Sequence, residues 1–160
     1  MRWLIMLVAL LGLVAAVLAR REHYRVGQSP CSINEKWDCG TVNKSPYAVV
    51  GGMLHPPGPD AQPGQQKGLM GTINSIPVAD IGIAGYIFLA FLAFKRWWPA
   101  LVAASVIALA FSVYLAHIEK DVLGVWCIYC VASLCAICII TLFSVITLIV
   151  NAVRKPKPSM

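Results

Sequence analysis

The stretch VLGVWCIYCVASLCAICIITLFSVITLIVNAV, residues 122–153, runs for thirty-two residues without a formal charge. A transmembrane helix needs about 20 predominantly apolar residues to cross a hydrocarbon core of about 30 Å. Backbone groups in lipid must hydrogen bond within a helix or a closed barrel, and the stretch has no alternating barrel pattern. It therefore predicts a membrane-spanning helix over residues 122–152.

Three further stretches are long and apolar enough to cross a bilayer, at residues 3–19, 76–94 and 97–116. Of the 160 residues, 59% are hydrophobic and 12% are charged, and the mean hydropathy is +0.74. A soluble domain of this length needs more polar residues to cover its surface. The net charge of +6 comes from cations that flank the apolar runs, which favours a membrane protein over a nucleic-acid-binding protein. We predict an all-α membrane protein with a single domain, residues 1–160, built as a four-helix transmembrane bundle.

The connector at residues 20–75 is the one large polar region of the sequence. Its Gly- and Pro-rich part, residues 51–72, is predicted to be a flexible surface loop. Residues 3–19 could instead form a cleaved signal peptide, since the sequence VLA before Arg20 resembles a small-residue cleavage site. The apolar run is longer than the ~7–15 residues typical of such a peptide, so we expect it to be retained as the first helix.

Four spans place the connector and the start of the fourth helix on one side of the membrane and both termini on the other. Cations occur on both sides. Arg2, Lys95, Arg96 and the tail RKPKPSM lie on the terminal side, and Arg20, Arg21 and Arg25 lie on the connector side. The positive-inside rule is nearly balanced, so charge alone does not orient the bundle.

Four of the six cysteines form two CxxC pairs in the fourth span: Cys127, Cys130, Cys135 and Cys138. Paired CxxC motifs can hold zinc or an iron–sulfur cluster. In a continuous helix, however, the first and last of these cysteines are roughly 16 Å apart along the axis at 1.5 Å per residue. Zinc–sulfur bonds are about 2.3 Å long, so one ion cannot bind all four sulfurs, and we predict no metal site.

The two pairs differ in their depth in the membrane. Counting back about 20 residues from Asn151 places the membrane surface just after the first pair. Cys127 and Cys130 then lie at the interface, near a helix N-terminus that stabilises a thiolate. Cys135 and Cys138 lie in the hydrocarbon, where a thiol resists ionisation and packs as a small apolar group. We predict that the first pair is redox-active and the second pair is not.

Cys31 and Cys39, eight residues apart in the connector, are placed to close a disulfide. One reading is a structural staple, since closing so short a loop contributes only roughly 2–3 kcal/mol. The other is a relay, because the topology puts this pair on the same side as Cys127 and Cys130, and thiol–disulfide exchange needs one thiolate to reach the other disulfide. Disulfides persist in oxidising compartments, so we expect this side to be extracytoplasmic.

The order and spacing of these motifs resemble the vitamin K epoxide reductase family and its bacterial homologues. The motifs are CSINEKWDC at residues 31–39 with Ser45 after it, NSIPVADIGIAGY at residues 74–86, and CIYC at residues 127–130. The resemblance covers about residues 3–150. It implies a four-helix bundle around a quinone, with the long extracytoplasmic loop capping the site. It further implies a multi-pass protein of a bacterial inner membrane, without a fused thioredoxin domain.

The resemblance also assigns roles to single residues. It implies that Cys127 exchanges with Cys39 and that Cys130 is the thiol beside the quinone ring. Quinone contacts are implied for Asn74, Ser45, Leu134 and Tyr86. Leu134 stands where the vertebrate enzyme has a tyrosine that contacts the quinone head group, a departure that bears on quinone selectivity and inhibitor sensitivity.

The sequence thus predicts a membrane thiol–quinone oxidoreductase. A thioredoxin-fold (DsbA-like) redox protein is expected to give electrons to Cys31 and Cys39, which pass them to Cys127 and Cys130. These would reduce ubiquinone, menaquinone or phylloquinone from the membrane quinone pool and so support disulfide formation. One alternative is reduction of vitamin K quinone or its epoxide as the physiological activity. The other is a non-catalytic membrane protein with a structural loop disulfide.

Overall fold

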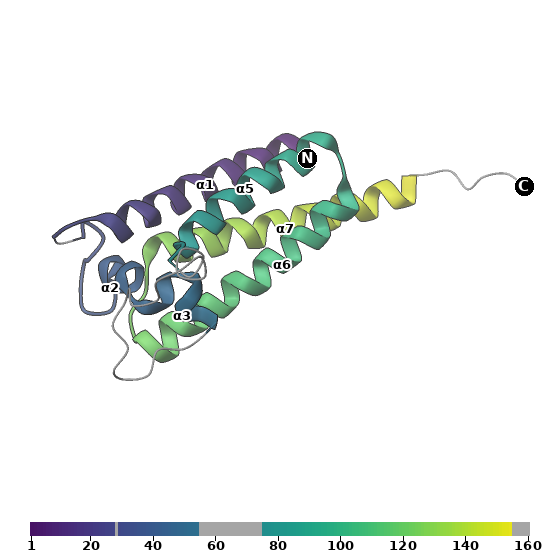
Figure 1. Cartoon of the computed structure of the whole chain (residues 1–160). Coiled ribbons are helices and arrows are strands. Elements are labelled where there is room, and N and C mark those ends of the chain that lie inside the picture. Colours follow the sequence, from purple (N-terminus) through teal and green to yellow (C-terminus); the bar gives the residue numbers. More distant parts are fainter. Residues whose placement is uncertain (28, 55–74, 155–160) are drawn as a thin grey trace, which may run out of the picture.

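The computed structural model describes residues 1–27, 29–54 and 75–154. Four long helices form the body of the molecule: α1 (Arg2–Tyr24), α5 (Val78–Lys95), α6 (Trp98–His117) and α7 (Ile128–Arg154). Each is long and apolar enough to cross a membrane, α6 together with the turn that continues it. The four helices run alongside one another, and the described residues form no strand (Figure 1). The predicted all-α fold with four membrane-spanning helices is confirmed.

The first helix extends beyond the predicted end at residue 19. Its last turns are polar, but they pack against α2 in the connector and against α5. There Arg20 Nε lies 2.6 Å from Asp80 Oδ1 in the first turn of α5. Asp80 is therefore a paired carboxylate at a helix start, where the positive end of the helix dipole also favours it.

The fourth helix begins at Ile128 rather than at residue 122. The helix α6 continues as one π-helical turn, η2 (Ile118–Leu123), and Gly124 ends this turn with a φ of 68°. Glycine adopts this left-handed conformation without a Cβ clash. Residues 125–127 stay outside any helix, and the backbone of Trp126 pairs with the connector. This break puts Cys127 directly before the helix and Cys130 in its first turn.

The helix α1 is an integral part of the bundle, since it packs against both α5 and α7. A Cβ atom at Gly12 would overlap the ring of Tyr86, so the two helices are in closest contact at this glycine. The hydroxyl of Tyr86 donates to the backbone oxygen of Ser133 on α7 at 2.8 Å. The helix α1 thus covers part of the core, with Ile5, Ala9 and Ala16 among its buried residues.

The connector forms a helical cap over one end of the bundle. Three short elements build it: α2 (Cys39–Lys44), η1 (Pro46–Ala48) and α3 (Val50–Leu54). They lie at the end opposite Met1 and the end of α7 (Figure 1). The backbone N–H of Val50 donates to the oxygen of Ile76 at 3.1 Å, which ties the cap to the start of α5. Residues 51–54 of the segment predicted to be flexible belong to α3, and residues 55–72 lie outside the described residues.

Candidate active site

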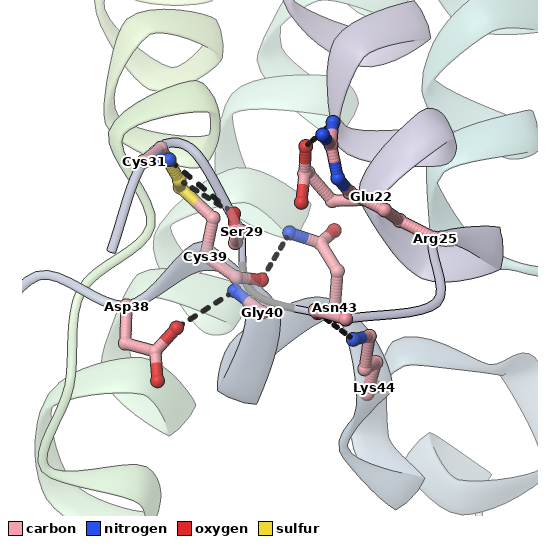
Figure 2. A network of polar contacts seen from close by, with 10 residues as sticks. Glu22, Arg25, Ser29, Cys31, Asp38, Cys39, Gly40, Asn43 and Lys44 are labelled. Carbon is pink, nitrogen blue, oxygen red and sulfur yellow. Dashed lines mark hydrogen bonds and ion pairs between the residues drawn. A yellow bond between two sulfur atoms is a disulfide. The ribbon is translucent and has the colours of Figure 1, made fainter.

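The connector cysteines Cys31 and Cys39 form a disulfide at the start of α2, with their Cα atoms 5.8 Å apart (Figure 2). Cys39 is fully buried and Cys31 is 6% exposed. The carboxylate of Asp38 caps α2, because its Oδ1 accepts the backbone N–H of Gly40 at 2.9 Å and that of Thr41 at 3.3 Å. The cap fixes the first residue of α2, which is Cys39.

Two hydroxyl groups keep this cap ionised. Ser32 Oγ donates to Asp38 Oδ1 at 2.5 Å, and Thr41 Oγ1 donates to Oδ2 at 2.6 Å. The hydrogen bond from Ser32, followed by that from Thr41, lowers the pKa of Asp38 below its usual value. The carboxylate is therefore charged, and α2 capped, at any pH above the usual range for aspartate.

The loop that carries the disulfide is hydrogen bonded to the segment directly before Cys127. The backbone N–H of Asp38 donates to the oxygen of Trp126 at 3.1 Å. In return, the N–H of Trp126 donates to the oxygen of Lys36 at 2.8 Å. This two-bond ladder places the connector pair next to the pair at the start of α7, although about ninety residues of sequence separate them.

One buried amide joins the two pairs. Asn43 Nδ2 donates to the backbone oxygen of Cys39 at 2.9 Å and to the sulfur of Cys127 at 3.3 Å. Asn43 is 7% exposed, and Cys127 is fully buried in a cluster with Cys31 and Cys39. The structure thus brings three of the predicted redox cysteines into one water-poor cluster, with Cys130 packed at its edge.

A histidine on α1 holds Asn43 in this position. His23 Nδ1 lies 2.5 Å from the backbone oxygen of Asn43. Because a carbonyl oxygen only accepts, Nδ1 carries the proton in this contact. The asparagine is thus held through its backbone by α1, while its side chain points toward Cys39 (Figure 2).

The sulfur of Cys127 is surrounded by hydrogen-bond donors. The thiol of Cys130 is the strongest of these, and the backbone N–H of Cys130 and the amide of Asn43 add to it. Together they hold the pKa of Cys127 below the usual thiol value, against the opposing effect of burial. Cys127 is therefore the sulfur of this pair that is better stabilised as a thiolate.

A buried carboxyl group, Glu119, lies on the other side of the pair. It is 3% exposed, and its Oε2 accepts the backbone N–H of Cys127 at 3.0 Å. Glu119 and Cys130 both line the pocket beside this pair. The π-helical turn η2 directs Glu119 inward, while the next residues, Lys120 and Asp121, are exposed. In the sequence, Glu119 stands directly before Lys120 and Asp121, and such a group of charges is typical of the end of a membrane span.

Cys130 opens onto a pocket between the four helices and the cap. The space free of atoms amounts to about 990 Å³, its open side included, and the lining is mostly apolar. A mostly apolar lining with a few polar groups is typical of sites for small organic molecules. Two of the predicted quinone contacts line it, Ser45 from the end of α2 and Leu134 from α7.

Of the other two predicted contacts, the structure describes only Tyr86. Tyr86 lines an adjoining hollow between α5, α6 and α7, which shares Gly82, Phe111 and Ser133 with the first pocket. Its hydroxyl is bound to Ser133, and it does not line the pocket beside Cys130. Asn74 lies outside the described residues.

The second CxxC pair has a different environment. Cys135 and Cys138 are exposed on the surface of α7, where the helices present apolar side chains outward. Among the described residues, no three His, Cys, Asp or Glu side chains are grouped to hold a metal ion. The two pairs therefore differ in their environment within the fold, since Cys127 is buried whereas Cys135 and Cys138 are exposed.

Comparison with known families agrees with this site. The sequence model of the Vitamin K epoxide reductase family matches residues 3–153, nearly the whole chain. The chain belongs to this family. No curated protein matches the chain in sequence. Membership in the vitamin K epoxide reductase family indicates an integral membrane oxidoreductase that couples thiols to a quinone or to vitamin K, working with redox partners.

Proposed function

We propose that this vitamin K epoxide reductase homologue is a dithiol–quinone oxidoreductase. It takes electrons from a thioredoxin-fold (DsbA-like) partner through Cys31 and Cys39, and it uses Cys127 and Cys130 to reduce a membrane quinone. Regenerating the oxidised partner in this way supports disulfide formation. The proposal includes the orientation, with the cap and all four redox cysteines on the extracytoplasmic side of a bacterial inner membrane.

One observation carries the proposal. The connector disulfide and the sulfur of Cys127 share a buried cluster, bridged by the amide of Asn43, and Cys130 faces a mostly apolar pocket. A structural staple needs no second dithiol beside it. A relay needs this juxtaposition, because exchange proceeds by attack of a thiolate on a neighbouring disulfide.

The proposed exchange begins at the connector disulfide. A dithiol of the partner reduces Cys31–Cys39 and leaves as a disulfide. The thiolate of Cys39 then attacks Cys127 in an oxidised Cys127–Cys130 pair, and Cys130 leaves as a thiolate. Cys31 attacks Cys39, which restores the connector disulfide and frees Cys127. The result is the state seen in the structure, with Cys31–Cys39 bonded and Cys127 and Cys130 free.

The second half of the reaction oxidises Cys127 and Cys130 again. Their two thiols give up two electrons and two protons, a new sulfur–sulfur bond forms, and quinone plus these electrons and protons gives hydroquinone. Cys130 is the attacking sulfur in this proposal, since it lines the pocket. The lowered pKa of Cys127 favours its thiolate, which suits it to close the disulfide on Cys130 afterwards.

Quinone contacts are proposed for Ser45 and Leu134 in the pocket, for Tyr86 in the adjoining hollow, and for Asn74. Leu134 offers no hydroxyl to a quinone oxygen, in contrast to the tyrosine of the vertebrate enzyme. The head group is accordingly held by shape and by the polar groups near Cys130. Ubiquinone, menaquinone and phylloquinone are the candidate substrates.

Trapping the exchange intermediate tests the order of the relay. In the variant Cys130→Ala, Cys127 attacks the connector disulfide at Cys39 and no resolving thiol remains. We expect a Cys39–Cys127 disulfide, identified by peptide mapping of the non-reduced protein, and no quinone reduction. The matched variant Cys138→Ala changes a cysteine of the same helix and should behave as the unmodified chain. A Cys31–Cys127 link, or full quinone reduction by Cys130→Ala, would overturn the proposed order.

Reduction of a quinone epoxide is the second candidate function, and the family itself favours it, since the family is named for that reaction. Supplying vitamin K epoxide to the reduced protein and measuring the quinone formed separates the two activities. Turnover of the epoxide faster than turnover of the quinone would make the epoxide the preferred substrate.

A further inference from the structure

Glu119 is a buried carboxyl group at the point where the thiols meet the pocket. It is 3% exposed and lines the pocket beside Cys130. The ion pairs among the described residues do not include it. Burying a carboxyl group without a cation is costly, so its presence needs a reason other than stability.

The reaction needs a group that moves protons at this place. Oxidation of the dithiol releases two protons in a pocket whose lining is mostly apolar, and hydroquinone must take up two. The other titratable side chains that face Glu119 or the pocket are His23 from α1, Tyr47 from η1, and Cys127, Tyr129 and Cys130 at the start of α7. Glu119 is the one carboxyl group in the described lining.

We propose that Glu119 is a catalytic residue that carries the proton of Cys130 to the quinone. This inference rests on the proposed function and deepens it. The carboxylate accepts the thiol proton as the sulfur of Cys130 attacks, so an S–H bond breaks and an O–H bond forms on Glu119. The carboxylic acid then gives the same proton to the reduced quinone oxygen and becomes a carboxylate again. The second proton comes from Cys127, or from water when Cys127 is already a thiolate.

A purely structural role for Glu119 makes a different prediction. Its contact with the backbone N–H of Cys127 requires only an oxygen acceptor. The amide of glutamine supplies that oxygen with nearly the same shape, but it cannot accept and release a proton at neutral pH. Glu119→Gln therefore keeps the structural contact and removes the proposed chemistry.

The first arm of the test measures the thiol without any quinone. In a Cys127→Ala background, the proposal leaves Glu119 as the one proton partner of Cys130. At pH values between the pKa values of this pair, the two groups together hold one proton. A fixed fraction of Cys130 is then thiolate over that pH interval. We expect its alkylation rate to be independent of pH over that interval. Glu119→Gln should abolish this plateau, so that the rate falls about tenfold for each pH unit below the thiol pKa. Equal pH profiles with and without Glu119 would overturn the proposal.

The second arm measures a single turnover of the reduced, full-length chain with a short-chain quinone. Glu119→Gln should slow it by roughly 100-fold or more, as loss of a general acid–base does, and Glu119→Asp should restore part of the rate. Glu22→Gln is the matched control: Glu22 is equally buried, belongs to α1 near Arg25 (Figure 2), and does not line the pocket. An unchanged rate in Glu119→Gln would also overturn the proposal. The two arms also separate this inference from the proposed function. If the unmodified chain reduces no quinone, the proposed function fails. Loss of the alkylation plateau in Glu119→Gln would still show proton transfer between Cys130 and Glu119.

Discussion

At the scale of the residue, the amide of Asn43 is the contact that links the two redox pairs. It donates to the backbone of Cys39 and to the sulfur of Cys127, so it both positions the cap and stabilises a thiolate. Hydrogen bonds to the charged form of a group favour ionisation. The pKa of Cys127 is therefore expected to respond to this one side chain.

We predict that Asn43→Leu raises the pKa of Cys127 toward the usual value of about 8.5 for a free cysteine. The sign follows from the lowered pKa in the unmodified chain: removing a donor to the thiolate makes ionisation less favourable. Cysteine labelled at the ¹³C-β position reports ionisation by NMR without requiring a reagent to enter the buried site. The titration midpoint should move to higher pH, with the signal of Cys135 as an internal reference. An unchanged midpoint would show that Asn43 does not act on the sulfur.

The sequence revealed the cysteines of the site but not their neighbours. Cysteine chemistry and CxxC spacing are visible in any sequence, and depth counting separated the first pair from Cys135 and Cys138. Glu119 stands beside Lys120 and Asp121, and such a group of charges is typical of a helix end. Only the π-helical turn directs it inward, and no residue pattern predicts that turn. The one feature of the sequence that could have pointed to Glu119 as a site residue is its position, eight residues before Cys127.

At the scale of the element, the break between α6 and α7 decides where the redox pair lies. Hydropathy runs on without interruption from residue 122, so the apolar pattern predicted a helix from there. Gly124, with its positive φ, ends the π-helical turn, and Trp126 then pairs with Lys36 and Asp38 of the connector. Hydropathy could not predict this break. It depends on the side chains of neighbouring residues, whereas the break is held by backbone hydrogen bonds to a loop that is distant in sequence.

We predict that Gly124→Ala destabilises the site by about 1 kcal/mol, because a residue with a Cβ is strained at a φ of 68°. The space around Gly124 is open, so the cost comes from the backbone and not from a clash. Asparagine tolerates the left-handed region, and Gly124→Asn should be close to the unmodified chain. Unfolding in detergent mixtures measures the free energies. An equal loss of unfolding free energy in both variants would show that backbone strain at this position is not the cause.

The packing of α1 on α5 gives a second prediction at this scale. Gly12→Ala places a methyl group into the ring of Tyr86 and should force the two helices apart, at a cost of about 1–3 kcal/mol. Gly85→Ala, in α5 and with no atom near its Cβ position, is the control and should cost little. Comparable losses in the two variants would contradict the close contact of α1 with α5.

At the scale of the whole molecule, the bundle was predictable and the cap was not. Four apolar stretches of sufficient length specify four spans, because lipid tolerates no unpaired backbone. The elements α2, η1 and α3 are too short to show a periodic pattern, and docking onto the bundle holds them in place. The cysteines alone led to the prediction of which side of the bundle carries the redox pairs, since the charges on the two sides are nearly balanced.

The proposed function requires electrons to pass from the connector pair to Cys127 and Cys130 and then to quinone. The fully reduced chain holds two dithiols, so it should reduce one quinone for each of them. Without the connector pair, in Cys31→Ser/Cys39→Ser, the remaining dithiol should still reduce one. Without Cys130, neither dithiol should deliver its electrons.

The most direct measurement is therefore the number of quinones reduced anaerobically per reduced chain, followed by quinone absorbance. We predict two for the unmodified chain, two for Cys135→Ala/Cys138→Ala, one for Cys31→Ser/Cys39→Ser, and none for Cys130→Ala. Quinone reduction by Cys130→Ala at the level of the unmodified chain would contradict the central claim.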